Sequence, residues 1–202
     1  MTNTNIVMIG VSTGGPIVLK RLFGELPQLD AAFVIVLHIP PGMDYRIAKS
    51  LASVAAMPVA LAEDGDYLRS GQIYLAPGGF HLKLEGNSRI ILEEGPRVNF
   101  VQPSVDVAMK SLLKPLKRGR MIGVILTGMG RDGAEGIRHI KDLGGTTFAQ
   151  DQESSAIYGM PQAAAETGAV DFVLPPEKIG RKLVELLSCR LGEQRLAPAV
   201  SH

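Results

Sequence analysis

Short runs of apolar residues recur along the chain, and several are followed by a loop containing glycine or proline and then by apolar residues at helical spacing. In the first such unit, the β-branched run 5–11 precedes the segment STGGP, and the next apolar positions are Ile17, Leu19, Leu22, Phe23 and Leu26. This pattern predicts a strand, a tight turn and a helix. Strands that alternate with helices in this way are typical of a parallel sheet covered by helices.

The same order recurs in the rest of the chain, with one interruption. Further strands are predicted at 31–38, 121–128, 146–150 and 170–174, and further helices at 45–55, 105–116, 134–145 and 175–191. Residues 58–100 instead contain short apolar runs and a hairpin-like stretch, so we expect a mixed sheet there. The predicted fold class is α/β, with a three-layer, doubly wound, mostly parallel sheet and an antiparallel hairpin insertion.

Composition and charge narrow the class of protein. The chain has 202 residues, 46% hydrophobic and 20% charged, which is typical of a globular protein, and we expect one domain over 2–190 followed by a frayed tail over 191–202. The net charge of +1 does not favour nucleic acid or an anionic membrane, and no apolar run reaches the ~20 residues of a membrane span. The single cysteine, Cys189, cannot form an intramolecular disulfide, and the opening sequence MTNTNIVMIG lacks the features of a secretory signal. We therefore expect a cytoplasmic protein.

The segment Gly10-Val11-Ser12-Thr13-Gly14 matches the pattern G-x-S-x-G between a predicted strand and a predicted helix. In a nucleophile elbow, a sharp turn exposes the serine hydroxyl, and the N–H of the next residue, here Thr13, faces the developing oxyanion. Two alternatives stay open at this point. Ser12 or Thr13 can cap the helix, or the turn can hold a phosphate, although it contains neither G-x-G-x-x-G nor G-K-[ST].

A serine hydroxyl needs a base within hydrogen-bond reach to act as a nucleophile near neutral pH. Of the four histidines, His38 ends an apolar strand, which places it at the same carboxyl edge of a parallel sheet as Ser12. His81 lies within a predicted strand, His139 lies within a predicted helix, and His202 is the last residue. The shared sheet edge favours His38 as the base.

The third group of such a site is a carboxylate that orients the imidazole. Asp132 follows the predicted strand 121–128 in a glycine-rich loop, and Asp151 follows the strand 146–150. Both aspartates therefore lie at carboxyl ends of strands, and each can instead cap a helix or a turn. Position alone leaves both open, although the glycines around Asp132 allow the backbone to approach the nucleophile closely.

Six segments of the chain are shared, in the same order, with one protein family. They are GVSTGGP, LHIPPGM, AEDGDYLRSGQIYLAPGG, QPSVDVAMKS, GVILTGMGRDGAEG and AQDQESSAIYGMPQAAAETGAVD. From about Asn5 to Leu187, the sequence resembles the catalytic domain of the chemotaxis receptor methylesterases, the CheB family. The resemblance implies a protein-glutamate methylesterase that acts on methylated chemoreceptor helices, and many members of the family also deamidate receptor glutamines.

Carried over by motif, the resemblance assigns the nucleophile to Ser12, the base to His38 and the acid to Asp132. It assigns the oxyanion donors to the backbone of Met129 and Thr13. We expect no cofactor and no metal ion, because no cluster of histidines or carboxylates in the sequence has the spacing of a zinc site. Members of the family commonly carry an N-terminal receiver domain, whereas this sequence begins at the first strand of the esterase domain, so it is either a free-standing relative or a fragment, and a receiver-domain regulator is an expected partner.

Two further features bear on the substrate. The family usually has a basic residue before PSVD, whereas this sequence has Phe100-Val101-Gln102 there, which does not favour a charge contact with an acidic receptor helix at that point. A basic cluster in the sequence consists of Lys110, Lys114, Lys117, Arg118 and Arg120. This cluster can contact a glutamate-rich helix of the substrate or can simply be a solvated helix end. The competing class of function is a Rossmann-like binding module without catalysis, in which STGGP holds a phosphate or an acidic peptide.

Overall fold

The computed structural model describes residues 5–113, 115–116 and 119–188, and its centre is a seven-stranded sheet in which all pairings are parallel. The strand order is β3-β4-β2-β1-β7-β8-β9. The strands are β1 (Asn5–Val11), β2 (Ala31–Leu37), β3 (Val59–Leu61), β4 (Gln72–Leu75), β7 (Met121–Ile125), β8 (Thr146–Gln150) and β9 (Phe172–Leu174). The α/β class and the doubly wound arrangement are confirmed.

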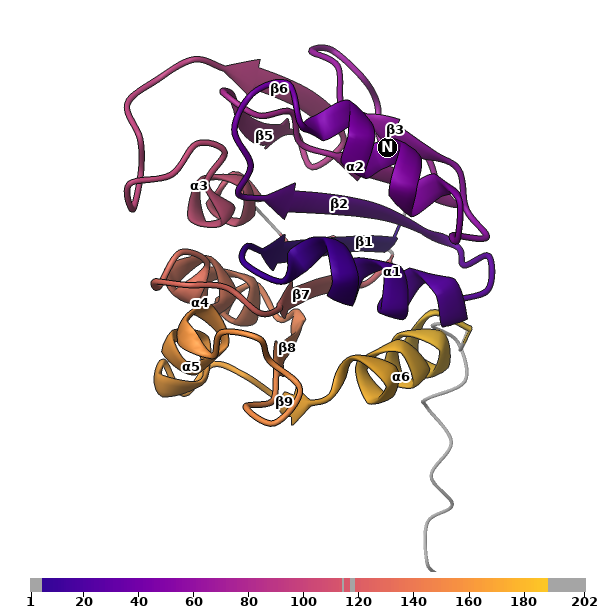
Figure 1. Cartoon of the computed structure of the whole chain (residues 1–202), viewed down its shortest axis with the longest axis vertical. Helices are drawn as coiled ribbons and strands as arrows, with labels where there is room; N and C mark the ends of the chain where they lie inside the picture. The colour runs from indigo at the N-terminus through magenta and orange to yellow at the C-terminus, as the bar shows by residue number, and fades with distance from the viewer. Residues whose placement is uncertain (1–4, 114, 117–118, 189–202) are drawn as a thin grey trace, which may run out of the picture.

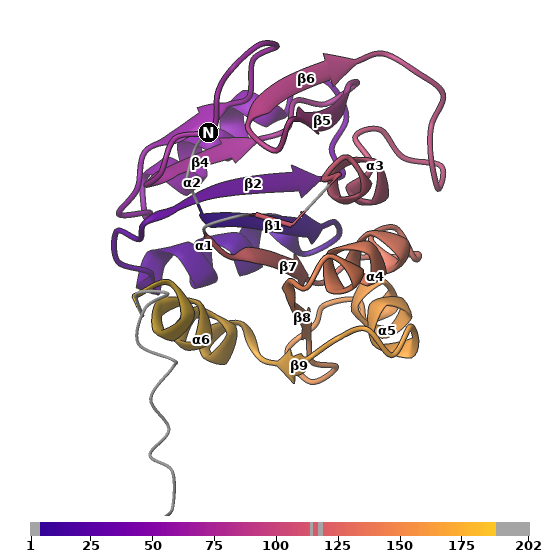
Figure 2. The ribbon, with the colours of Figure 1, turned by 180° about the vertical axis from the view of Figure 1, so that it is seen from behind.

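Helices cover both faces of this sheet. They are α1 (Gly15–Glu25), α2 (Asp44–Ala52), α3 (Val105–Lys110), α4 (Ala134–Asp142), α5 (Gly159–Glu166) and α6 (Pro176–Ser188). Helices α1, α2 and α6 lie on the near face in Figure 1, whereas α3, α4 and α5 face the viewer in Figure 2. Each face has its own apolar core, because alternate residues of a strand point to opposite sides: Val7 and Ile9 of β1 pack with α1, whereas Ile6 and Met8 pack with α4 and α5.

The hairpin within residues 58–100 consists of β5 (His81–Glu85) and β6 (Arg89–Glu93), which pair antiparallel with each other. These two strands form a sheet of their own, so the expectation of a mixed sheet in this region is wrong. Leu82, Leu84 and Ile90 are buried in the same core as α3, and the hairpin therefore packs beside α3 on that face of the main sheet (Figure 2). The preceding strands β3 and β4 join the main sheet in parallel.

Several other elements differ from the prediction. The helix expected at 105–116 ends at Lys110, since Ser111 turns its hydroxyl to the carbonyl of Ala108. The strand expected at 121–128 ends at Ile125, and the residues after it form a loop. Helix α5 and the three-residue strand β3 were not predicted, because short elements give little periodicity. The predicted tail, 191–202, lies outside the described residues.

The order of the strands determines where a site can form. The chain moves from β1 to β2 on one side of β1, and β7 pairs with the other side. In doubly wound sheets, the crevice at the carboxyl ends of strands where the direction of winding reverses is the usual binding position. Here that position is the end of β1, and Ser12 is the next residue.

Candidate functional site

Ser12 lies on a sharp turn between β1 and α1. The N–H of Ser12 donates to the carbonyl of Thr127, and the N–H of Gly15 donates to the carbonyl of Ser12. The residue that caps α1 is Gly14, which has φ 83° and supplies no side-chain hydrogen bond. Neither Ser12 nor Thr13 therefore caps the helix through its side chain, and the half-buried hydroxyl of Ser12 is left for another role.

His38 reaches the same edge of the sheet from the neighbouring strand. Val11 and Leu37 are paired across β1 and β2, and the N–H of His38 donates to the carbonyl of Val11. Ser12 and His38 are thus the first residues beyond a pair of aligned strand ends. Within the described part of the chain, no hydrogen bond joins Ser12 Oγ to the His38 ring, which is common for catalytic groups in the absence of substrate.

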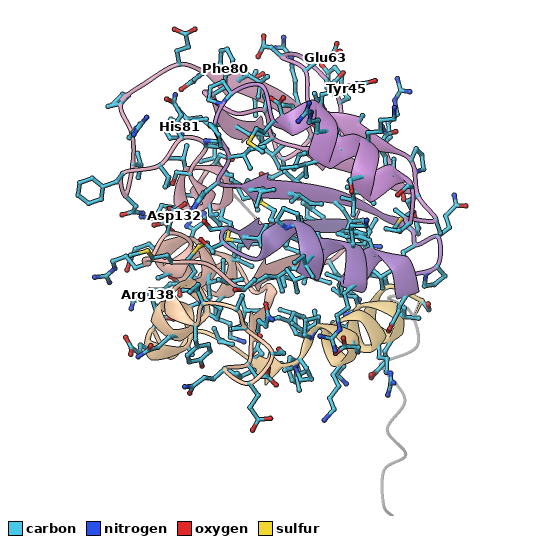
Figure 3. The ribbon with its side chains drawn as sticks, viewed as in Figure 1. Tyr45, Glu63, Phe80, His81, Asp132 and Arg138 are labelled. Atoms are coloured by element: carbon cyan, nitrogen blue, oxygen red, sulfur yellow. The ribbon has the colours of Figure 1, made fainter. Side chains whose placement is uncertain are left out.

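The His38 side chain is joined to Asp132 in the loop between β7 and α4. His38 Nε2 lies 2.8 Å from Asp132 Oδ2, and the two side chains are 9% and 3% exposed. Figure 3 shows Asp132 at the edge of the sheet toward which the strand arrows point. Asp132 does not cap α4, since the cap is Gly133 and no side-chain hydrogen bond is made there. The structure therefore brings the predicted base and the predicted acid into contact.

Asp132 is surrounded by hydrogen-bond donors. Its two oxygens accept hydrogen bonds from His38 and from Asn99 Nδ2 at 2.8 Å, Ser104 Oγ at 2.8 Å, Val105 N at 2.6 Å and Asp106 N at 3.2 Å. Burial alone favours a neutral carboxyl, but the hydrogen bonds from His38, Asn99, Ser104 and Val105 outweigh it and hold the pKa of Asp132 below its ordinary value. Asp132 is therefore an ionised acceptor that keeps the His38 ring in place.

Asp151, the alternative acid, has a different role. Its Oδ1 atom accepts hydrogen bonds from the N–H of Ser154 at 3.1 Å and from the Ser154 hydroxyl at 2.5 Å. These contacts cap the turn after β8, as the second interpretation of this residue proposed. None of the hydrogen bonds of Asp151 involves His38.

A second buried carboxylate, Asp106, lies behind Asp132. Asp106 Oδ1 accepts the N–H groups of Gly133 and Gly136 at the start of α4, and Oδ2 accepts a hydrogen bond from Asn99 Nδ2 at 2.8 Å. Burial raises the pKa of Asp106 above its ordinary value, and the negative charge of Asp132 acts in the same direction. The Asn99 amide therefore bridges two carboxylates, with one contact to each.

Asn99, Ser104 and Asp106 are site residues that the sequence analysis did not find. Ser104 and Asp106 lie in the shared segment QPSVDVAMKS, but a serine followed by an acidic residue before a helix usually indicates no more than a cap. Ser104 does cap α3, through Val107 N, while its hydroxyl also donates to Asp132. Asn99 gives no signal in the sequence, since its contacts depend on how a distant turn packs.

The loop after β7 packs next to Ser12. Gly128 N donates to Ile157 O, and Gly128 O accepts the N–H groups of Gly159 and Met160, which fixes this loop against the start of α5. A Cβ atom placed on Gly128 would lie 2.8 Å from Ser12 Cβ. Among the described residues, no hydrogen bond uses the N–H of Thr13 or of Met129.

The other histidines are held by structural contacts or lie outside the described residues. His81 Nδ1 accepts the N–H of Ser104, and His81 Nε2 lies 3.0 Å from Pro96 O, so this side chain supports the segment that holds Asp132. Figure 3 shows His81 on the hairpin near Asp132, and Arg138 on α4 beyond it. His139 Nε2 lies 2.5 Å from Leu112 O. His202 is outside the described residues.

The remaining sequence predictions concern charge, metals and membranes. Lys110 ends α3, the N–H of Arg120 donates to Asn5 Oδ1, and the basic residues at 114, 117 and 118 lie outside the described residues, as does Cys189. No group of three His, Cys, Asp or Glu side chains in the described segments is arranged to hold a metal ion. None of the described helices is long and apolar enough to cross a membrane.

The fold and the site define a doubly wound α/β protein with a serine, a histidine and a buried aspartate gathered where the winding of the sheet reverses. The model of the CheB methylesterase family matches residues 7–183, and the chain belongs to this family. A crystal structure of the CheB methylesterase catalytic domain of Thermotoga maritima is similar, with a TM-score of 0.84 and 39% identity over 91% of this chain and 98% of that one.

Two curated relatives illustrate the similarity in sequence. The protein-glutamate methylesterase/protein-glutamine glutaminase of Pyrococcus horikoshii is 42% identical over 96% of this chain and 54% of its own length. A second protein of that name, from Anaeromyxobacter dehalogenans, is 46% identical over 90% of this chain and 53% of its own length. The chain thus spans about half the length of the curated relatives it matches.

Proposed function

We propose that this chain hydrolyses γ-methyl esters of glutamate side chains on chemoreceptors and deamidates glutamines at the same kind of position. The observation that carries the proposal is the His38–Asp132 pair next to Ser12 at the carboxyl edge of the sheet. Membership of the CheB methylesterase family and the names of the curated relatives support the same activity. In this proposal, residues 2–190 are the catalytic domain and 191–202 a tail.

The first half of the reaction forms an acyl-enzyme. Ser12 Oγ attacks the γ-carbonyl carbon of the methylated glutamate while His38 takes up the hydroxyl proton. The tetrahedral intermediate then collapses, its bond to the methoxy group breaks, and His38 returns the proton so that methanol leaves. The glutamyl group is now bound to Ser12 as an ester.

The second half regenerates the enzyme with water. His38 accepts a proton from a water molecule as the oxygen of that water attacks the acyl carbon, and the bond to Ser12 Oγ breaks with return of the proton to the serine. The product is a free glutamate side chain. A glutamine substrate passes through the same acyl-enzyme, with ammonia in place of methanol as the leaving group.

The remaining site residues stabilise charge. Asp132 holds the imidazole in one orientation and stabilises the imidazolium that forms in both halves of the reaction. The N–H groups of Thr13 and Met129 donate to the oxyanion of each tetrahedral intermediate, a contribution that typically amounts to about 10²–10³ in rate for one donor. Every step uses groups of the chain, the substrate and water.

The proposed partners follow from this substrate. They are the cytoplasmic helices of methylated chemoreceptors and a receiver-domain regulator, and the protein acts in the cytoplasm. The competing proposal, a binding module without catalysis, requires the turn 12–16 to hold an anion. That module would not need the buried carboxylate that holds the His38 ring.

Substitution of Ser12 separates the two proposals. Ser12→Ala should remove nearly all hydrolysis of a methyl-ester substrate and leave the thermal midpoint close to that of the parent, because the hydroxyl makes no cap hydrogen bond. Release of methanol from a methylated chemoreceptor and hydrolysis of p-nitrophenyl acetate are the two readouts. A folded Ser12→Ala variant with activity within about tenfold of the parent would contradict the hydrolase.

A further inference from the structure

Phe100 has the largest exposed fraction among the described large apolar side chains, at 92%. Single exposed apolar residues are common on protein surfaces and need no explanation by themselves. Phe100 differs in its backbone, which has φ 66°, in the left-handed region that favours glycine. Because this backbone conformation is unfavourable for an aromatic residue, Phe100 at this position indicates a functional role and not a contribution to stability.

The backbone around Phe100 is a two-residue hairpin turn. Val98 and Val101 exchange both N–H···O hydrogen bonds at 3.1 Å, and the two residues between them, Asn99 and Phe100, have φ 52° and 66°. Both central residues are left-handed, as in a type I′ turn, for which Asn-Gly is the preferred sequence. Asn99 fits its position, whereas a glycine would fit the position of Phe100 better.

The other side of this turn is fixed to the catalytic machinery. Asn99 Nδ2 donates to Asp132 Oδ1 and to Asp106 Oδ2, each at 2.8 Å. Asp132 in turn binds His38. Phe100 is thus the direct neighbour of Asn99, which contacts the proposed acid. The backbone of Phe100 is therefore held in place relative to the site.

Other exposed apolar side chains lie on loops that leave the same edge of the sheet. Met129, at 76%, follows the Gly128 loop, and Met43, at 48%, lies in the loop after His38. Tyr45 is also exposed, but it lies on α2, apart from Asp132 in Figure 3. A small ester needs only the reacting groups, whereas a protein substrate must rest on the surface around them.

We propose that Phe100 is a specificity-determining residue that contacts an apolar side chain of the substrate protein beside the methylated glutamate. This inference rests on the proposed function. Asn99 holds the turn at Val98–Val101 to the acid, so that contact of the substrate protein with the Phe100 ring helps to place the ester over Ser12. The contact concerns the protein part of the substrate and leaves the chemistry of a small ester unaffected.

The test compares two substrates and three variants. Phe100→Gly removes the ring and relieves the turn, and Phe100→Tyr keeps a ring there. The matched control is Tyr67→Ala, because Tyr67 is 61% exposed and its backbone pairs with Arg89 of the hairpin and not with a site residue. The substrates are p-nitrophenyl acetate and a purified chemoreceptor that carries tritiated methyl esters.

We expect Phe100→Gly to hydrolyse p-nitrophenyl acetate within about twofold of the parent and to lose about tenfold or more in kcat/KM on the receptor, mainly through KM. Its thermal midpoint should be equal to that of the parent or higher. Phe100→Tyr should restore most of the receptor activity, and Tyr67→Ala should match the parent on both substrates.

Other outcomes would contradict either this inference or the proposed function. Equal losses on both substrates would make Phe100 a support of the catalytic groups and overturn the inference, and so would an unchanged receptor activity of Phe100→Gly. A parent chain that hydrolyses the small ester but not the receptor ester would contradict the proposed function, and the inference with it.

Discussion

His38 binds Asp132 through Nε2, which lies 2.8 Å from the carboxylate oxygen Oδ2. Because an ionised carboxylate only accepts hydrogen bonds, Nε2 must carry the ring hydrogen, and Nδ1 keeps its lone pair. Nδ1 is therefore the nitrogen that can accept the proton of Ser12. The opposite tautomer would present a hydrogen to the serine and could not act as a base.

The first prediction concerns the base. His38→Gln should lower turnover of a methyl ester by about 10² or more, because glutamine cannot take up the serine proton. His139→Gln is the matched control, since His139 lies on α4 and contacts the carbonyl of Leu112, which follows α3, instead of a site residue. Turnover and thermal midpoint are measured for both variants. A folded His139→Gln variant as inactive as His38→Gln would show that the base is misassigned.

The second prediction compares the two aspartates. Asp132→Asn should lower turnover about tenfold or more, because an amide in place of the carboxylate favours the wrong tautomer of His38; in the serine protease precedent, the loss is on the order of 10⁴. Asp151→Asn should act mainly on the turn that it caps. Both variants are assayed on one methyl-ester substrate. A near-normal Asp132→Asn beside a folded, inactive Asp151→Asn would transfer the role to Asp151.

The third prediction uses the opposite pKa shifts of two neighbouring carboxylates. The pKa of Asp132 is lowered on folding, so its contribution to stability is present above the unfolded value of about 3.9 and is lost as the pH falls through the folded value. The pKa of Asp106 is raised, so its contribution is present below about 3.9 and is lost as the pH rises through the folded value.

The free energy of unfolding should therefore rise less steeply from acid pH toward neutral pH in Asp132→Asn than in the parent. In Asp106→Asn it should rise more steeply, because the opposing contribution is removed. Urea unfolding at a series of pH values from about 2 to 6 measures both slopes. If the slope of the free energy of unfolding against pH changed in the same direction in both variants, this assignment of charge to the two carboxylates would be contradicted.

The fourth prediction tests the close approach of the β7 loop to the nucleophile. Gly128→Ala should lower turnover by about 10², because the added Cβ would displace Ser12 or the loop, and small displacements of reacting groups are costly. Gly24→Ala in α1 is the control, since its Cβ would meet only Val54 at 3.9 Å, and it should stabilise the chain by up to about 1 kcal/mol. An unaffected Gly128→Ala would show that the loop has room to adjust.

The elements that the sequence predicted well are those with a long, uniform pattern. Strand β1 has the predicted limits, because a β-branched run is bounded by a turn, and β2 ends one residue before the predicted position, which leaves His38 just beyond it. The helix that begins at Val105 was predicted too long, since the contacts of Ser111 with Ala108 and the hairpin depend on tertiary packing.

The same distinction applies to the site. Ser12 and His38 could be predicted to lie together because each directly follows a strand, and parallel strands end at a common edge. Strand position left Asp132 and Asp151 open, and the contact of Asp132 with His38 appears only in the structure. The bridging role of Asn99 and the raised pKa of Asp106 could not be found, because both arise from burial and from contacts across 33 and 26 residues of chain. The separate sheet formed by the hairpin likewise follows from packing and not from a local pattern.

The exposed segment 94–97, between the hairpin and the Asn99 turn, separates the residues of the proposed site into two parts of the chain. The part of the chain before it carries Ser12 and His38, and the part after it carries Asp132 with its donors. Strand β7 of the later part pairs directly with β1 of the earlier part. A chain cut within this segment would give two fragments, neither of which carries the complete proposed site. Hydrolysis recovered when the fragments are mixed would therefore report their reassociation, as in a split enzyme.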